Sequence, residues 1–388
     1  MGNRIFLILI GILFFSLRIS LAAGPEIKIG AVLSGSGKFI EPSEMMKNAY
    51  LLWEKQVNAR GGLLGKPVKL TLYDDQSSEE QVKALYEKLI KQDKVDLILS
   101  PYGTTLTMAA SEVTERYKYV MVAAAASGEK IWDRNFQYIA GVHALSDRYF
   151  IGFLDIIARN GFESVSILYE KSEFNISAAR GAADWAKRFG LKISLHEGFS
   201  DPEKELKPLL SRVSAVDTQA LIFCAYPQDC YRFIELMKTI GYRPRALAMT
   251  IAPALPNFPK VVGESAEGIF GPSQWEADSR LPFPGTVQFI KDFTEFSGKS
   301  PSYHAGDAFA ACQILEKAVS ETKTLNQKTL RDFVRSLDTV TVIGRFKVDY
   351  SGRQIGHEII LIQWQNGKKE ILYPLHMKTA NPKFGPIK

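Results

Sequence analysis

Hydrophobic and polar positions follow two alternating patterns along the first part of the chain. Short apolar runs typical of buried strands are each followed by apolar residues at three- and four-residue spacing, which predicts a helix. The expected strands are residues 27–33, 68–73, 95–99 and 119–123, with helices between them. Strict alternation of strand and helix predicts a parallel sheet that carries helices on both faces.

The same order begins again near residue 161, with expected strands at 164–169, 192–196, 220–224 and 246–250. We therefore expect an α/β fold of two doubly wound parallel-sheet lobes, which suits a length of 388 residues. After Gly271, successive helices follow without strands between them, so we expect them to complete lobes already begun. The chain then crosses between the lobes more than once. Asn366-Gly367 predicts a hairpin turn near the C-terminus.

The N-terminus has the three parts of a secretory signal peptide. Arg4 gives a positive start, residues 5–17 are apolar, and Ser20-Leu21-Ala22 offers small residues for cleavage near Ala22. A membrane anchor is the alternative, but the apolar run is shorter than the roughly 20 residues that a spanning helix needs. We therefore expect residues 1–22 to be removed and the mature protein to be exported to the periplasm.

Charge and cysteine content exclude several classes of function. Without Arg4 and Arg18 the net charge is 46 − 42 = +4, and no arginine-rich stripe points to nucleic acid binding. No cysteine stands directly after the signal peptide, where a lipid would be attached, so a lipid anchor is not expected. Cys224 and Cys230 are either a disulfide in an oxidising compartment or small buried apolar residues, and with Cys312 they show no metal-binding spacing.

Motifs for catalysis are missing. Gly37-Lys38 lacks the flanking residues of a phosphate-binding loop, and His357-Glu358 lacks the second histidine of a zinc protease. The chain has no Gly-x-Ser-x-Gly elbow. We therefore expect neither an enzyme nor a cofactor nor a metal site.

Four stretches resemble those of the type I periplasmic solute-binding proteins of the branched-chain amino acid (Leu/Ile/Val-binding) group. They occur in the same order as in that family, at residues 27–35 (IKIGAVLSG), 57–67 (VNARGGLLGKP), 73–75 (YDD) and 263–268 (GESAEG). The resemblance implies two lobes joined by three crossover strands, with a ligand clamped between them. The implied lobes are residues 25–143 plus 275–342 and residues 144–274 plus 343–375, followed by a tail, 376–388.

The same resemblance implies a function. It predicts a monomeric substrate-binding component of an ABC importer, which binds an amino acid or related small carboxylate and delivers it to a permease in the inner membrane. The alternative is a receptor that presents the same solute to a membrane signalling partner.

Ligands of open parallel sheets bind beyond the carboxyl ends of the strands. In the first lobe these ends carry the candidate ligand-binding residues Tyr102, Gly103, Thr104, Thr105, Ala125, Ala126 and Ser127. Gly103 permits close approach to the backbone, and hydroxyls at a helix start suit a carboxylate. Thr104 as a helix N-cap is the alternative, compatible with ligand contact. Ser127 matches the family's hydroxyl ligand.

In the second lobe, the resemblance assigns aromatic ligand contacts to Phe174 and Tyr226, and Thr250 and Trp275 complete the candidate set. Plain core or loop packing is the alternative for Phe174 and Trp275. The family's amino-acid binders usually hold the ligand ammonium with an acid after the fourth strand, but residues 249–253 (MTIAP) contain none. Asp229 or Glu173 could substitute. The ligand class therefore stays open between amino acids and other small carboxylates, including aromatic acids.

Overall fold

The computed structural model of the chain describes residues 25–216 and 218–385. The predicted signal peptide, residues 1–22, lies outside the described residues, so its cleavage near Ala22 stays a prediction. Within the described ranges, no helix is long and apolar enough to cross a membrane.

The first sheet contains five parallel strands in the order β2-β1-β3-β4-β5. They are β1 (Ile27–Leu33), β2 (Val68–Asp74), β3 (Leu97–Leu99), β4 (Met121–Ala123) and β5 (Ile139–Gly141). The helices between them are α1 (Ile40–Ala59), α2 (Glu79–Lys91) and α3 (Thr104–Tyr117). β1, β3 and β4 are buried almost throughout, as expected for strands covered on both faces.

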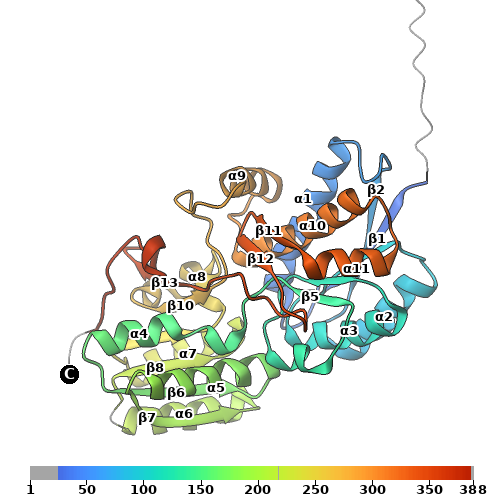
Figure 1. Cartoon of the computed structure of the whole chain (residues 1–388). Coiled ribbons are helices and arrows are strands. Elements are labelled where there is room, and N and C mark those ends of the chain that lie inside the picture. Colours follow the sequence, from blue (N-terminus) through green and yellow to red (C-terminus); the bar gives the residue numbers. More distant parts are fainter. Residues whose placement is uncertain (1–24, 217, 386–388) are drawn as a thin grey trace, which may run out of the picture.

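Three later helices return to this sheet, as the sequence predicts. They are α9 (Thr286–Ser297), α10 (Tyr303–Thr322) and α11 (Gln327–Ser336). α10 packs between α1 and β4, and α11 packs against α10 and β5 (Figure 1). Because α10 lies between a helix and the sheet, it is buried on most sides, and its first residues reach the carboxyl ends of the strands.

The second sheet is mixed, in the order β14-β13-β10-β9-β8-β6-β7. Its strands are β6 (Ser164–Glu170), β7 (Lys192–Phe199), β8 (Ala220–Cys224), β9 (Ala246–Met249), β10 (Phe270–Ser273), β13 (Ile360–Gln365) and β14 (Lys368–Tyr373). β6 to β10 are parallel, as expected for this lobe. β13 and β14 form an antiparallel hairpin at one edge, so the sheet as a whole is mixed. Asn366 and Gly367, both at positive φ, form the predicted turn.

Helices cover the second sheet, and the C-terminal segment closes its edge. The helices are α4 (Ile151–Arg159), α5 (Glu173–Arg188), α6 (Pro202–Ala215), α7 (Pro227–Ile240) and α8 (Phe258–Val262). The segment predicted as a tail packs on this lobe within its described part. Gln363 Nε2 donates to the Lys383 carbonyl over 2.6 Å, and the Phe384 ring lies 4.9 Å from that of Phe162.

The chain passes between the two sheets three times, after β5, after β10 and before β13 (Figure 1). Gln274 joins two of these segments, because its amide donates to the Ala144 carbonyl and accepts from the Ala144 N–H. His357 of the third segment lies 2.6 Å from the Gln274 carbonyl oxygen. The three crossings are therefore hydrogen-bonded to one another.

A small hairpin, β11 (Asp338–Thr341) with β12 (Gly344–Lys347), spans the predicted lobe boundary at 342/343. Val342 between the two strands accepts from Thr286 of α9 and donates to Gln313 of α10. We therefore propose that the first lobe extends to Lys347 and that the third crossing starts there.

Candidate functional site

A cavity lies between the two lobes, at the carboxyl ends of their strands. Every residue that lines it is buried. They are Tyr102, Gly103, Thr104, Ala125, Ser127, His143, Tyr149, Phe174, Tyr226, Ile251, Tyr303 and His304. The empty volume is about 240 Å³, of which about 10 Å³ can take the centre of a water molecule. That is room for roughly one water, so a larger solute enters only with the lobes further apart.

Most of the predicted site residues line this cavity. From the first lobe they are Tyr102, Gly103, Thr104, Ala125 and Ser127, and from the second Phe174 and Tyr226. The structure does not place Thr105, Ala126, Thr250 or Trp275 on the wall. Ligand contact by any of these residues stays a prediction, because cavity lining alone does not show binding.

Thr250 and Trp275 make contacts inside the protein. The Thr250 hydroxyl donates to the Ala225 carbonyl over 2.7 Å and accepts from the Ala225 N–H over 2.8 Å, so both its functions are used inside the lobe. Trp275 is fully buried, with its ring 5.8 Å from that of Phe289. Gly306 leaves space for the indole, since a Cβ there would lie 3.0 Å from it. The structure therefore shows internal contacts for both side chains, and their predicted contact with the ligand stays untested.

Thr104 lines the cavity from the first turn of α3. Gly103 is the N-cap, with φ of 83°, and its N–H donates to the Ala125 carbonyl over 2.9 Å. Thr104 is therefore the first helical residue and not the N-cap. Its Oγ1 accepts from the Gly128 N–H over 3.1 Å, which leaves the hydroxyl proton available to a ligand.

The Ser127 hydroxyl belongs to a chain of hydrogen bonds. One Gln274 N–H donates to the Ala144 carbonyl, and the same amide nitrogen donates to the Tyr149 hydroxyl over 3.1 Å. Ser127 Oγ lies 3.1 Å from the Tyr149 hydroxyl, and either group can donate in this bond. Burial raises the pKa of Tyr149 to about 12, so it stays protonated at neutral pH. Because one bond uses only one of the two hydroxyl protons, the other proton of the Ser127–Tyr149 pair is left to donate. Two hydroxyl donors beside a helix start can bind an anion.

Aromatic rings enclose the other sides of the cavity. Phe174 lies 5.5 Å from the Tyr149 ring and 5.9 Å from the Tyr226 ring, measured between centroids. Phe39, from the loop after β1, packs edge-on against Tyr226 at 4.8 Å and against Tyr102 at 5.6 Å. Flat apolar walls of this kind suit a planar or apolar ligand body.

Comparison with known proteins identifies the chain. The family model for the periplasmic binding protein matches residues 26–369. The leucine-specific-binding protein of Salmonella typhimurium is 22% identical over 345 residues, covering 88% of this chain and 92% of its own. The chain belongs to the periplasmic binding protein family. Members of this family bind solutes for ABC transporters and are not enzymes, so this periplasmic binding protein is not an enzyme.

Solved structures share the fold of this periplasmic binding protein at low sequence identity. LivJ from Streptococcus pneumoniae, in complex with isoleucine, has a TM-score of 0.80 and is 16% identical, covering 90% of this chain and all of its own. A solute-binding protein from R. palustris, in complex with benzoate, has a TM-score of 0.77 and is 17% identical, covering 92% of this chain and 97% of its own.

The acid that amino-acid binders of the family use is absent from the cavity of this periplasmic binding protein. The side chain on the wall after β9 is Ile251, an apolar residue at φ of 55°, where β-branched residues are strained. Neither predicted substitute lines the cavity. Glu173 pairs with Lys130 over 2.6 Å, and burial raises the pKa of Asp229 at the rim.

Five cavity residues escaped prediction from the sequence. They are His143, Tyr149, Ile251, Tyr303 and His304. His143 and Tyr149 flank the first crossing, whereas Tyr303 and His304 open α10 more than 150 positions later. No local pattern marked the last two, because α10 also carries other polar and charged residues along its length.

Ion pairs join the lobes around the cavity of this periplasmic binding protein. Lys38 Nζ lies 3.3 Å from a Glu170 oxygen and 5.0 Å from the Tyr226 ring centroid. Lys130 pairs with Glu173, as given above. These pairs are partly exposed, and such pairs contribute about 0–1 kcal/mol each.

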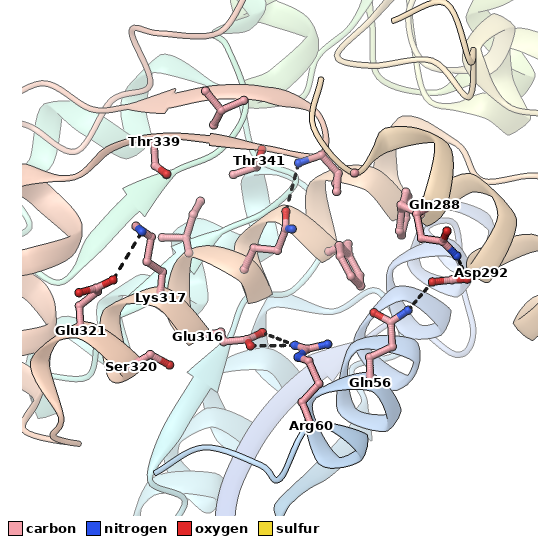
Figure 2. Close-up of a pocket in the computed structure, with 17 residues that line it drawn as sticks. Gln56, Arg60, Gln288, Asp292, Glu316, Lys317, Ser320, Glu321, Thr339 and Thr341 are labelled. Atoms are coloured by element: carbon pink, nitrogen blue, oxygen red, sulfur yellow. Dashed lines mark hydrogen bonds and ion pairs between the residues drawn. The ribbon is translucent and has the colours of Figure 1, made fainter. Parts of the chain in front are cut away.

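A second groove of this periplasmic binding protein lies on the first lobe, between α1, α9, α10 and β11, and Figure 2 shows it. It has an empty volume of about 1250 Å³ and is open to solvent. Its charges pair with one another: Arg60 with Glu316 over 2.8 Å, and Lys317 with Glu321 over 3.7 Å. None of its side chains is a buried polar group without a partner, and it holds no predicted ligand residue. We therefore place the solute site between the lobes.

The three cysteines are buried and unpaired. Cys230 Sγ lies 3.5 Å from the Ala225 carbonyl oxygen, and Cys224 ends β8 inside the sheet. The structure therefore favours Cys224 and Cys230 as small buried apolar residues over a Cys224–Cys230 disulfide. Across the part of the chain that the structure describes, no group of three or more His, Cys, Asp or Glu side chains could hold a metal ion.

Proposed function

We propose that this protein is the periplasmic, monomeric receptor of an ABC importer, which closes on a small carboxylate with an apolar or aromatic body and delivers it to an inner-membrane permease. The observation that carries this proposal is the polarity of the cavity wall. The Thr104 hydroxyl and the Ser127–Tyr149 hydroxyl pair each leave one proton free to donate, and the wall includes no Asp or Glu.

An amino-acid ligand would bring an ammonium group into that cavity. A buried ammonium without a counter-charge costs several kcal/mol, so a zwitterion is disfavoured where Ile251 replaces an acid. A carboxylate without an ammonium meets hydroxyl donors and apolar or aromatic side chains and needs no counter-charge from an acid. The R. palustris protein in complex with benzoate has the same fold, which is consistent with an aromatic acid as ligand.

A thermal-shift panel tests the ligand class, because a ligand that binds only the folded protein raises Tm. The panel compares leucine, isoleucine and valine with benzoate, phenylacetate and short aliphatic acids. We expect the largest shift from an aromatic acid. If a branched-chain amino acid gives the largest shift and the acids give none, the inference from the missing acid is wrong.

The transport role has its own test. Deletion of the gene in the native organism is expected to abolish uptake of the radiolabelled acid at low external concentration, with restoration by the wild-type gene. Unchanged uptake together with a lost transcriptional or chemotactic response would support the sensing role instead.

A further inference from the structure

Two histidines on the cavity wall have no part in the carboxylate contacts described above. His143 lies in the first crossing and is 3% exposed, and His304 lies in the first turn of α10 and is fully buried. His143 Nδ1 and His304 Nε2 have no hydrogen-bond partner among the described residues. Buried polar atoms are rarely left without a partner. Each nitrogen is therefore available to a bound solute.

The two imidazoles belong to one wall. Both lie against the ring of Tyr303, with centroid distances of 5.7 Å for His143 and 3.9 Å for His304. The His304 ring is also edge-on to Tyr102 at 5.3 Å. Packing on two sides fixes the orientation of His304, so its Nε2 is a preorganised group.

Asp307 decides what His143 offers to the cavity. Its Oδ2 lies 2.5 Å from His143 Nε2, and both groups are buried. Burial favours a pair without net charge, in which the two groups share one proton between Nε2 and Oδ2. In either case, with the shared proton on the ring or on the carboxyl, His143 Nδ1 carries a proton of its own. His143 therefore presents an N–H donor to the cavity.

His304 is the adaptable partner. Burial lowers its pKa well below the usual value, so its ring is neutral. Its Nδ1 lies 3.2 Å from Ser302 Oγ, a hydroxyl that can either donate or accept. The free Nε2 can accordingly be an acceptor or a donor. One fixed donor beside one adaptable nitrogen matches a hydroxyl oxygen, which accepts and donates at once.

We propose that His143 Nδ1 and His304 Nε2 form a second polar subsite, which binds a hydroxyl group on the body of an aromatic carboxylate. The inference rests on the proposed function, since it assumes that Thr104 and Ser127 hold the carboxylate of the same ligand. It narrows the ligand from an aromatic acid to a hydroxylated one.

The opposite assignment is that the pair binds an ammonium. His143 would then accept at Nδ1, and Asp307 would carry a buried negative charge. Oδ1 of Asp307 has no hydrogen-bond partner among the described residues, and burial raises the pKa of this carboxyl while His143 opposes the rise. An ionised Asp307 held by one hydrogen bond is poorly stabilised, so the neutral pair is favoured.

Calorimetric titration with benzoate and with 2-, 3- and 4-hydroxybenzoate tests the subsite on the intact protein. At least one hydroxybenzoate is expected to bind about tenfold or more tightly than benzoate, because a site built for a hydroxyl disfavours the analogue without it. His304→Phe keeps the ring packing and removes the nitrogens. It is expected to reduce the hydroxybenzoate preference to about threefold or less, and His304→Gln, which keeps a polar end, to restore part of it.

Asp307→Asn separates the two assignments, since it removes the charge and keeps hydrogen-bonding atoms beside His143. The preference for the hydroxylated acid is expected to persist in this variant. Equal affinity for benzoate and all three hydroxybenzoates would overturn the subsite and leave the proposed function intact. No binding by any of the four aromatic acids would likewise overturn the subsite, whereas leucine binding that Asp307→Asn abolishes would overturn both. Thermal unfolding of each variant verifies that it is folded.

Discussion

Thr104→Val replaces one hydroxyl by a methyl group of the same shape, and the structure predicts two separable losses. The Gly128 N–H loses its acceptor in a buried position, which costs about 1–3 kcal/mol of folding free energy. For a lobe of this size that corresponds to a fall in Tm of about 2–12 °C. The hydrogen bond between Thr104 and Gly128 joins residues 24 positions apart, so the loss of stability can be predicted from the structure but not from the sequence.

The second loss is in ligand affinity. A hydrogen bond from Thr104 to a carboxylate contributes about 1.5–3 kcal/mol, so its removal is expected to raise Kd about 10- to 150-fold. Thr104→Ser is the matched control, because it retains the oxygen and loses only the methyl group that packs against Gly128. It is expected to keep most of the affinity.

The assay is calorimetric titration with benzoate, together with thermal unfolding of the free variants. Thr104→Val with wild-type Kd would remove the hydroxyl from the ligand site, whatever its Tm. A Tm equal to that of the wild type would instead contradict the structural role of the Gly128 bond.

Three further results are expected. Tyr149→Phe leaves Gln274 short of an acceptor, so the unfolding free energy from urea denaturation should fall by about 1–3 kcal/mol, and an unchanged value would contradict a stabilising hydrogen bond from Gln274 to Tyr149. Burial lowers the pKa of His357 to about 4, below its unfolded value of about 6.5, so its contribution to stability is complete above pH 6.5 and is lost as pH falls toward 4. The wild type should therefore lose about 2 kcal/mol more than His357→Gln between pH 7 and pH 5, and equal losses would refute this. Lys130→Gln, which removes the partner of Glu173, should raise Kd up to about fivefold at low ionic strength and less in high salt, and a salt-independent effect would contradict an electrostatic origin.

The sequence predicted the layered architecture because local patterns determine it. Each buried apolar run became a strand, and the helices after Thr286 packed back on the first sheet as expected. The turn of the β13–β14 hairpin was predicted at Asn366-Gly367. The pairing of this hairpin with β10 was not predicted. Edge pairing depends on contacts between segments about 90 residues apart, which no local pattern records.

The candidate site was predictable only where it follows a strand. Gly103 and Ser127 follow β3 and β4 directly, so their place at the cavity follows from the topology of parallel sheets. His304 reaches the same cavity because α10 lies between α1 and the sheet, a long-range packing result. Trp275 was proposed as a flat apolar wall for an aromatic ligand, with core packing as the alternative, and in the structure it packs against Phe289 of α9 and Gly306 of α10.

The small cavity also bears on how long a solute stays bound. Its wall combines buried residues of both lobes, so in this arrangement a solute departs only when the lobes separate. Residence time is then limited by the frequency of lobe opening, and solutes of different affinity share the same lower limit on exchange time. A membrane partner that held the lobes apart would release any of them, because it would act on the protein's shape and not on the chemistry of the bound molecule.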